Sequence, residues 1–311
     1  MANPPERRPS MPPIPSFTRG PVSVHFGDKS GKYPDGNQVL VRGGDTLVAF
    51  DTPLVANRLG TELTAADLVI LGHVHEDHIA GLHRLPSARV LAPQADLAAL
   101  RSWEGLARHY GYAPRALEGM KAKIERDFHY VARPDAEGYA DGALWDLGGG
   151  VRVRALHMPG HTSGHSVLLV EPEGIAFIGD IDLSSFGPYY GDATSSLVEF
   201  RRTLERVKDV PARVWITSHH KGVITERATF LALLAAFAAK LGAREQAIAD
   251  HLAGAGPSTL EALVAHRFVY PRGYRDVFIE DVERRTIAQH LASLAGCGRV
   301  SEEGGRYRLA A

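Results

Sequence analysis

The chain has 311 residues, of which 44% are hydrophobic, and a formal net charge of −1. This composition is typical of a globular protein with enough apolar residues for a core, and the balanced charge argues against nucleic acid or an anionic membrane as the main partner. Cys297 is the only cysteine, so an intramolecular disulfide is excluded and any metal site would need nitrogen and oxygen ligands.

The two kinds of segment that would direct the chain to a membrane are not apparent in the sequence. Residues 1–15 are rich in proline and contain no apolar stretch typical of a signal peptide, so we predict a disordered lead-in over residues 1–19. The longest apolar run, residues 228–239, is shorter than the roughly 20 residues that cross a bilayer. We therefore expect a cytoplasmic protein with no membrane partner.

Strand and helix patterns alternate over residues 20–225, which predicts one α/β domain. We expect strands over residues 21–26, 37–42, 46–51, 68–71, 88–92, 151–156, 166–170, 175–178 and 214–217. A helix should begin at residue 79, and residues 94–145 are predicted to form a helical insertion. Five aromatic residues of this insertion could either cover a site or form a small core of their own: Trp103, Tyr110, Tyr112, Phe128 and Tyr130.

The pattern changes in residues 226–311, which we predict to be a helical linker followed by a winged-helix-like domain. Helices are expected over residues 228–241, 245–252, 259–266 and 282–295, and a hairpin over residues 298–309. Winged helices often bind DNA, but residues 241–311 contain nine arginines, no lysine and nine acidic residues. This balance favours a structural or oligomerising role, and the module could mediate a homodimer.

The strongest chemical signal is the run from His73 to His78, which contains three histidines and two carboxylates and follows an apolar strand. Neutral imidazole is the commonest zinc ligand, and carboxylates complete its coordination shell. His73 and His75 project to one side of an extended segment, and Asp77 and His78 follow on the turn. Glu76 is expected to be a solvated loop residue.

Three further segments place a residue capable of metal chemistry at the end of a strand. His161 lies in a turn rich in glycine, Asp180 follows Gly179, and His219 precedes His220. Each of these signals is weak alone, because a histidine or aspartate at a strand end is more often a cap or a surface group. Together with the first run, they predict a site for one or more metal ions.

These motifs resemble those of the metallo-β-lactamase superfamily. The family's His-x-His-x-Asp-His motif matches His73, His75, Asp77 and His78, and its later motifs match Gly160-His161-Thr162, Gly179-Asp180 and His219. The resemblance implies an αββα sandwich that holds two divalent metal ions, of which Zn²⁺ is favoured and iron or manganese are alternatives.

The resemblance also implies a ligand set and a role for the C-terminal part. One metal would take His73, His75 and His161, the other would take Asp77, His78 and His219, and Asp180 would bridge them. The sequence around the last histidine departs from the family's Pro-Gly-His-Gly, so His220 remains an alternative to His219. The C-terminal part looks like the winged helix appended in relatives of beta-lactamase-like protein 2.

The function that the resemblance implies is hydrolysis by a hydroxide shared between the two metals, with Asp77 and Asp180 orienting it and either of them carrying the proton to the leaving group. The leading hypothesis for the substrate is a small ester, thioester or lactone. The alternatives are phosphodiester cleavage of single-stranded RNA by an endoribonuclease, β-lactamase activity, and a non-catalytic binding protein.

Two groups of residues are expected around the metals. The candidates for orienting the histidine ligands are Asp51, Thr162, His165 and Asp182. The candidates for contacting the substrate are Tyr189, Tyr190, His220 and Lys221, with Ser184, Ser185 and Phe186 near the mouth of the site.

Overall fold

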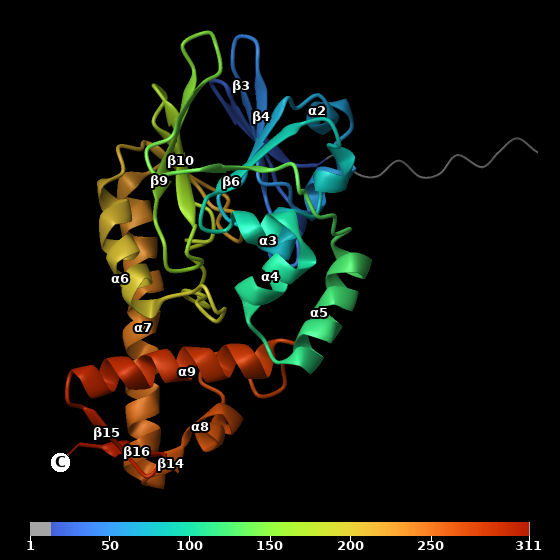
Figure 1. The fold of residues 1–311 in the computed structure, drawn as a ribbon. Helices are drawn as coiled ribbons and strands as arrows, with labels where there is room; N and C mark the ends of the chain where they lie inside the picture. The colour runs from blue at the N-terminus through green and yellow to red at the C-terminus, as the bar shows by residue number, and fades with distance from the viewer. Residues whose placement is uncertain (1–13, 311) are drawn as a thin grey trace, which may run out of the picture.

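The computed structural model describes residues 14–310 (Figure 1). The predicted lead-in over residues 1–19 falls largely outside this range. The prediction of disorder is wrong for residues 16–19, because Ser16–Arg19 forms strand β1 and pairs antiparallel with β2. In this described part no helix is long and apolar enough to cross a membrane.

The first sheet has seven strands, joined in chain order from β1 to β7. After β1, its strands are β2 (Val22–His25), β3 (Gln38–Arg42), β4 (Leu47–Phe50), β5 (Leu68–Ile70), β6 (Arg89–Pro93) and β7 (Glu137–Tyr139). Strands β1 to β4 pair antiparallel, whereas β4 to β7 pair in parallel. The parallel strands end at the same edge, where the loop with His73 begins.

The second sheet has six strands in the order β13-β12-β11-β10-β9-β8. They are β8 (Leu144–Asp146), β9 (Arg152–His157), β10 (Ser166–Glu171), β11 (Ile175–Phe177), β12 (Val214–Ile216) and β13 (Val223–Ile224). Strands β11 and β12 pair in parallel, so the loops that carry Asp180 and His219 leave the sheet side by side.

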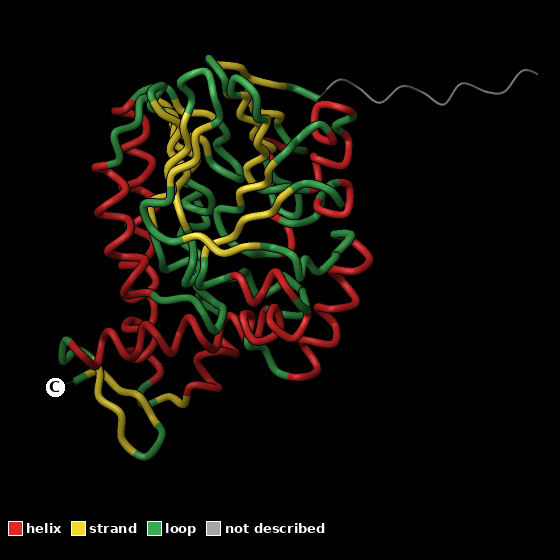
Figure 2. The backbone as a smooth tube through the Cα atoms, turned by 45° about the horizontal axis from the view of Figure 1, so that its top comes forward, coloured by secondary structure: helices red, strands yellow, loops and turns green. Residues whose placement is uncertain are grey.

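The two sheets pack face to face, with helices on the outside (Figures 1 and 2). Alternation along β10 shows the layers, because Leu168 and Val170 face the core between the sheets while Val167 and Leu169 face the outer helices. Buried apolar residues on both faces explain why this strand reads as a continuous hydrophobic run.

Helices α6 (Leu197–Arg206) and α7 (Arg227–Ala255) cover the outer face of the second sheet, and the shorter α2 (Thr61–Thr64) and α3 (Leu97–Arg101) lie on the side of the first (Figure 1). Short turns complete this layer: α1 (Asp28–Gly31) and the 3-10 turns Leu54–Arg58, Glu76–His78, Leu82–Arg84 and Val207–Asp209. The helix predicted from residue 79 is therefore only one 3-10 turn.

The predicted insertion over residues 94–145 ends too late. Its helices are α3, α4 (Trp103–Tyr110) and α5 (Pro114–Asp127), but residues 137–139 and 144–146 are strands β7 and β8 of the two sheets. Both strands are short and partly exposed, so they lack the buried apolar run that marks a strand in sequence.

The C-terminal part consists of the end of α7, α8 (Leu260–His266), α9 (Ile279–Gly296) and a three-stranded sheet of β14 (Ser258–Thr259), β15 (Val300–Glu303) and β16 (Arg306–Leu309). Two helices were predicted where α7 is continuous through Gly242. Its first half packs on the second sheet through Phe230 and Leu234, and its second half packs in the C-terminal core through Ile248. These contacts outweigh the cost of about 1 kcal/mol of one helical glycine.

Candidate metal centre

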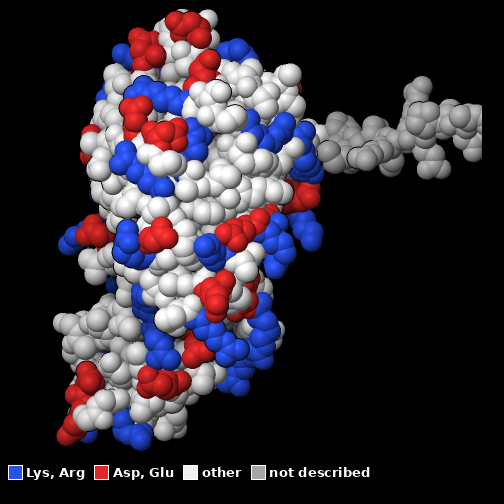
Figure 3. Space-filling model, turned by 45° about the vertical axis from the view of Figure 1, so that its right-hand side comes forward, with Lys and Arg blue, Asp and Glu red and all other residues white. Residues whose placement is uncertain are grey.

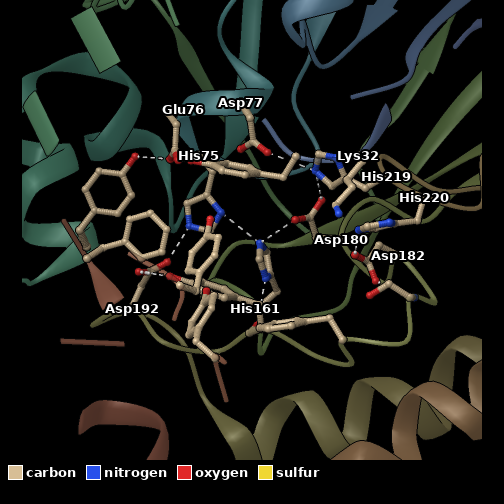
Figure 4. Close-up of a pocket in the computed structure, with 18 of the residues that line it drawn as sticks. Lys32, His75, Glu76, Asp77, His161, Asp180, Asp182, Asp192, His219 and His220 are labelled. Carbon is tan, nitrogen blue, oxygen red and sulfur yellow. Dashed lines mark hydrogen bonds and ion pairs between the residues drawn. The ribbon is translucent and has the colours of Figure 1, made fainter. Parts of the chain in front are cut away.

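Four loops meet at one edge of the two sheets and bring together the seven side chains predicted as metal ligands. Figure 4 labels five of them: His75, Asp77, His161, Asp180 and His219. The loop after β5 provides His73, His75, Asp77 and His78, and the other loops follow β9, β11 and β12. Six of the seven side chains belong to residues that are less than 7% exposed, and Asp180 is the most accessible at 15% of its side chain.

His73, His75 and His161 form the first cluster. His73 Nε2 lies 3.2 Å from His75 Nδ1 and 3.1 Å from His161 Nε2, and the last two nitrogens are 3.0 Å apart. Tetrahedral zinc with Zn–N bonds of about 2.0–2.1 Å separates its nitrogen ligands by roughly 3.3 Å. The spacing of the three nitrogens therefore fits one metal ion.

Asp77, His78 and His219 form the second cluster, in which one ligand atom of each lies within 4.8 Å of the others. His219 Nε2 is 3.2 Å from Asp77 Oδ2. Asp180 stands between the two clusters (Figure 4). Its Oδ2 is 3.3 Å from His161 Nε2, and its Oδ1 is 3.1 Å from His78 Nε2 and 3.5 Å from His219 Nε2. A carboxylate in this position can contact two metal ions at once.

In four of the five histidines, the ring nitrogen that faces away from the clusters is hydrogen-bonded, which turns the other nitrogen toward the clusters. His75 Nε2 donates to Asp192 Oδ2 at 2.7 Å, and His78 Nδ1 donates to Asp51 Oδ2 at 2.7 Å. His161 Nδ1 donates to the carbonyl of Tyr189, and His219 Nδ1 to that of Gly31. Each bond leaves the lone pair of the other nitrogen directed inward, as metal binding requires.

Two buried atoms at the centre have no hydrogen-bond partner among the described residues: His78 Nε2 and Asp180 Oδ1. With the His78 proton on Nδ1, these atoms face each other as two lone pairs and need a positive charge between them. Without a metal, a second proton on His78 supplies it. Burial lowers the pKa of His78, but the carboxylates of Asp180, Asp77 and Asp51 raise it well above its ordinary value overall.

The electrostatics of the first cluster favour neutral rings, with one exception. Burial lowers the pKa of His161 to about 3 and that of His73 well below its ordinary value. Burial would also lower the pKa of His75, but the hydrogen bond and charge of Asp192 raise it to about 9. The buried His/Asp cluster is thus consistent with a dinuclear metal hydrolase.

The four residues predicted to orient the ligands differ in what they contact. Asp51 accepts the proton of His78 as predicted, and its Oδ1 also accepts the Gly72 amide at 2.7 Å, so both oxygens are engaged. Thr162 donates to Asp96 rather than to a ligand. His165 accepts the backbone amide of Asp180 at 3.2 Å, and Asp182 accepts the Ser184 amide.

Two glycines allow the loops to approach each other closely. Gly160, before His161, has φ 132°, and a Cβ there would lie 2.3 Å from the backbone of Phe200. Gly179, before Asp180, has φ 55°, and a Cβ there would lie 2.6 Å from His165 Nε2. Larger residues at either position would displace the side chain that follows.

A cavity of about 390 Å³ opens beside the clusters. The five aromatic residues of the predicted insertion all pack in or against the adjoining apolar core, and Tyr110 and Tyr112 also line the cavity. Glu76 was wrongly predicted to be solvated. It is 6% exposed and accepts hydrogen bonds from Tyr33 at 3.0 Å and Tyr110 at 2.6 Å.

Only some of the residues predicted to contact the substrate line the cavity. Tyr189 and His220 line the cavity, as do Ser184, Ser185 and Phe186. The prediction that Tyr190 contacts the substrate is wrong, because this residue is 1% exposed and its hydroxyl bonds to His290 of α9 at 2.7 Å. Lys221 is exposed and outside the cavity, because the left-handed backbone of His220 (φ 58°) turns the chain toward solvent.

Sequence reasoning missed two buried aspartates and one wall of the cavity. Asp192 holds His75, and Asp96 accepts Thr162 Oγ1 at 2.6 Å and the Gly164 amide at 2.8 Å. Both lie in loops without a motif. The wall comes from Tyr270, Pro271, Tyr274 and Phe278, far along the chain from the other lining residues.

Sequence comparisons identify a family and two curated relatives. The Metallo-beta-lactamase superfamily matches residues 35–235. The Beta-lactamase-like protein 2 homolog of Drosophila melanogaster is 26% identical over 192 residues, which cover 61% of this chain and 56% of the fly protein. The metallo-beta-lactamase fold-containing protein ST1585 of Sulfurisphaera tokodaii is 26% identical over 189 residues, which cover 57% of this chain and 69% of that protein. The match thus spans little more than half of the fly relative.

Solved structures extend the similarity beyond the matched family region. The metallo-beta-lactamase family protein TTHA1429 of Thermus thermophilus has a TM-score of 0.65 and 25% identity, over 88% of this chain and 93% of its own. A beta-lactamase domain protein of Burkholderia ambifaria shares the fold, with a TM-score of 0.65 and 18% identity over 97% of this chain and 96% of its own. The family match, the two sheets and the His/Asp cluster agree: the chain belongs to the metallo-β-lactamase superfamily.

Proposed function

We propose that this protein is a dinuclear metal-dependent hydrolase of a small ester, thioester or lactone. The observation that carries the proposal is the position of Asp180, with one oxygen beside His161 and the other beside His78 and His219. We propose His73, His75 and His161 as ligands of one ion and Asp77, His78 and His219 as ligands of the other. His219 is preferred to His220, which is directed to Asp182 at 3.7 Å. Zn²⁺ suits this donor set best.

The chain's own residues would bind, orient and transfer protons. Two bound divalent ions would supply Lewis acidity and a water that ionises near neutral pH. Asp77 and Asp180 would orient that water through their carboxylate oxygens, and Asp180, the more accessible, would carry a proton to the leaving group. The burial of the histidines would exclude bulk water from the reacting atoms.

The cavity favours a small substrate over a nucleic acid. Glu76, Asp182 and Asp192 line it in addition to the two aspartates of the clusters, and Lys32 is the single lysine or arginine among its described lining residues. Basic and acidic side chains are interspersed over most of the face in Figure 3. A polyanion would gain little from such surfaces.

The test is a panel of substrates offered to zinc-loaded protein: p-nitrophenyl esters, acyl thioesters, lactones, bis-p-nitrophenyl phosphate and nitrocefin. We expect hydrolysis of at least one carboxylic substrate, and a loss of about a hundredfold or more in Asp180→Asn. The exposed His83→Ala is the matched control and should retain full activity. A preference for the phosphodiester or for nitrocefin, or less than one equivalent of bound metal, would overturn the proposal.

A further inference from the structure

We propose that the C-terminal segment 270–278 gives the cavity an aromatic bay that binds the uncharged, apolar acyl group of the substrate. The aromatic bay consists of Tyr112, Met120, Phe186, Tyr270, Tyr274 and Phe278. This inference rests on the proposed function, since it names the part of the ester, thioester or lactone that the site selects.

The rings of the bay form a continuous apolar surface beside the metal clusters. Tyr270 lies at the centre, with ring centroids 5.2 Å from Phe186, 6.3 Å from Phe278 and 5.4 Å from Tyr274, on which it stacks. Phe278 continues the surface to Tyr112 at 6.3 Å. Met120 adds a flexible thioether side chain, which adapts to apolar ligands.

Four tyrosine hydroxyls of the cavity lining already donate hydrogen bonds to carboxylates. Tyr112 donates to Asp192 at 2.5 Å, and Tyr189 donates to the same oxygen at 3.0 Å. Tyr110 and Tyr33 donate to Glu76. Because these hydroxyls have partners, the rings present mainly their faces and edges to the cavity. Such walls favour apolar groups, with polar contacts confined to a few positions.

Away from the proposed metal ions, the charged side chains of the cavity wall oppose an anionic acyl group. Glu76, Asp182 and Asp192 supply carboxylates around the bay, against Lys32 alone among the described lining residues that are lysine or arginine. Besides Asp180 Oδ1, Ser184 Oγ is a buried polar atom of the lining residues that has no partner among the described residues. A hydroxyl there can donate to an ester or lactone oxygen.

The bay is held in place before any ligand enters. Glu283 is fully buried in α9 and accepts the backbone amides of Val269 and Tyr270, the latter at 2.7 Å. Lys123 of α5 pairs with Asp276 at 2.5 Å, which fastens the other end of the segment. A cavity of about 390 Å³ is near the lower end for small-ligand sites, so medium-length acyl chains should fit and long ones should not.

Kinetics on p-nitrophenyl acetate, octanoate, dodecanoate and hydrogen succinate test the selection. Each buried methylene contributes roughly a fourfold gain in affinity, so kcat/KM for octanoate should exceed that for acetate by at least about thirtyfold. Dodecanoate and the anionic succinate should both be poorer than octanoate. Acetate or succinate equal to octanoate would overturn the inference.

Variants of the wall separate the bay from general effects on the fold. Tyr270→Ala and the more exposed Tyr274→Ala should lower kcat/KM for octanoate about tenfold while changing that for acetate less than twofold. Val277→Ala is the matched control, because this residue is 41% exposed in the same segment and does not line the cavity. Equal losses of kcat/KM on both esters, or the same loss in Val277→Ala, would contradict the proposal that the aromatic bay binds the acyl group.

Binding of hydroxamates provides a readout that does not depend on turnover. Octanohydroxamate and acetohydroxamate present the same metal-binding group, so the ratio of their dissociation constants on zinc-loaded protein reports the bay alone. We expect a ratio of at least about thirty that falls about tenfold in Tyr270→Ala. If every carboxylic substrate resists hydrolysis, the proposed function fails, but the ratio of the two dissociation constants still tests whether the aromatic bay binds the acyl group. A ratio near one would overturn that role of the aromatic bay even if the protein is an active hydrolase.

Discussion

At the scale of single residues, buried aspartates position the histidines of the metal centre. Asp51 and Asp192 each accept a ring proton at 2.7 Å, from His78 and His75 respectively, and their other oxygens accept further donors. A carboxylate behind a histidine fixes its tautomer and increases its basicity. These two residues therefore determine which nitrogen would face a bound metal.

The substitution Asp192→Asn tests this positioning. The amide keeps the size of the side chain but removes the charge behind His75, so we expect metal affinity to fall by about 10–100-fold. Titration with a competing chelator measures the affinity. Asp250→Asn, an exposed residue of α7, serves as control. An unchanged affinity in Asp192→Asn would mean that this carboxylate only packs the loop.

Asp96 acts differently, because it joins two of the metal-bearing loops rather than contacting a ligand. It accepts Thr162 Oγ1, the Gly164 amide and, at 3.4 Å, the Val74 amide. Asp96→Ala leaves these buried donors without a partner, so we expect a loss of about 1–3 kcal/mol in the free energy of unfolding. Urea unfolding of the metal-free protein measures it; a loss below about 0.5 kcal/mol would contradict this account.

At the scale of elements, α9 connects the C-terminal part to the side of the molecule that contains the His/Asp clusters. Figure 1 shows α9 crossing below α4 and α5. Its residues Ile279 and Val282 belong to the same apolar cluster as these helices. Arg285 donates to the carbonyls of Tyr110, Gly111 and Gly191 at 2.7–3.0 Å. The C-terminal part is therefore a structural component of the cavity.

Two neighbouring arginines of α9 give a matched test of this connection. Arg285→Ala removes the donors of three carbonyls, and we expect a loss of about 2–3 kcal/mol because hydrogen bonds to a charged group are among the stronger ones. Arg284 instead pairs with the exposed Glu261, so Arg284→Ala should cost less than about 1 kcal/mol. Denaturant unfolding compares the two, and equal losses would show that Arg285 does not fasten α9.

At the scale of the whole molecule, the parts that could be predicted are those in which neighbouring residues carry the signal. Buried strands such as β10 and the run from His73 to His78 are recognisable because alternation and ligand spacing are local. Asp192 and Tyr270 could not be predicted, since their positions depend on contacts with His75 and α9 that are distant in sequence. The prediction that Tyr190 contacts the substrate was wrong for the same reason, because its burial depends on His290 and Arg244.

The charge balance of the assembled centre predicts how metal binding should depend on pH. His75 and His219, with pKa values of about 9 and about 10, hold protons at neutral pH in the metal-free protein because the nearby aspartates outweigh the effect of burial. Zinc requires unprotonated nitrogen, so binding must release these protons. The apparent affinity should therefore rise as the pH increases from neutrality toward the His75 pKa of about 9, by about tenfold per unit for each proton released.

Calorimetry at one pH in two buffers of different ionisation enthalpy counts the released protons directly. Zinc should also raise the thermal midpoint, because the metal binds the folded chain far better than the unfolded one, and chelation should reverse the gain. His83→Ala should leave both quantities unchanged, since this exposed histidine lies outside the clusters. An affinity that does not vary with pH would show that the inward nitrogens are already unprotonated. The carboxylates would then have no cation to balance them in the metal-free site, contrary to the short contact of Asp180 with His78.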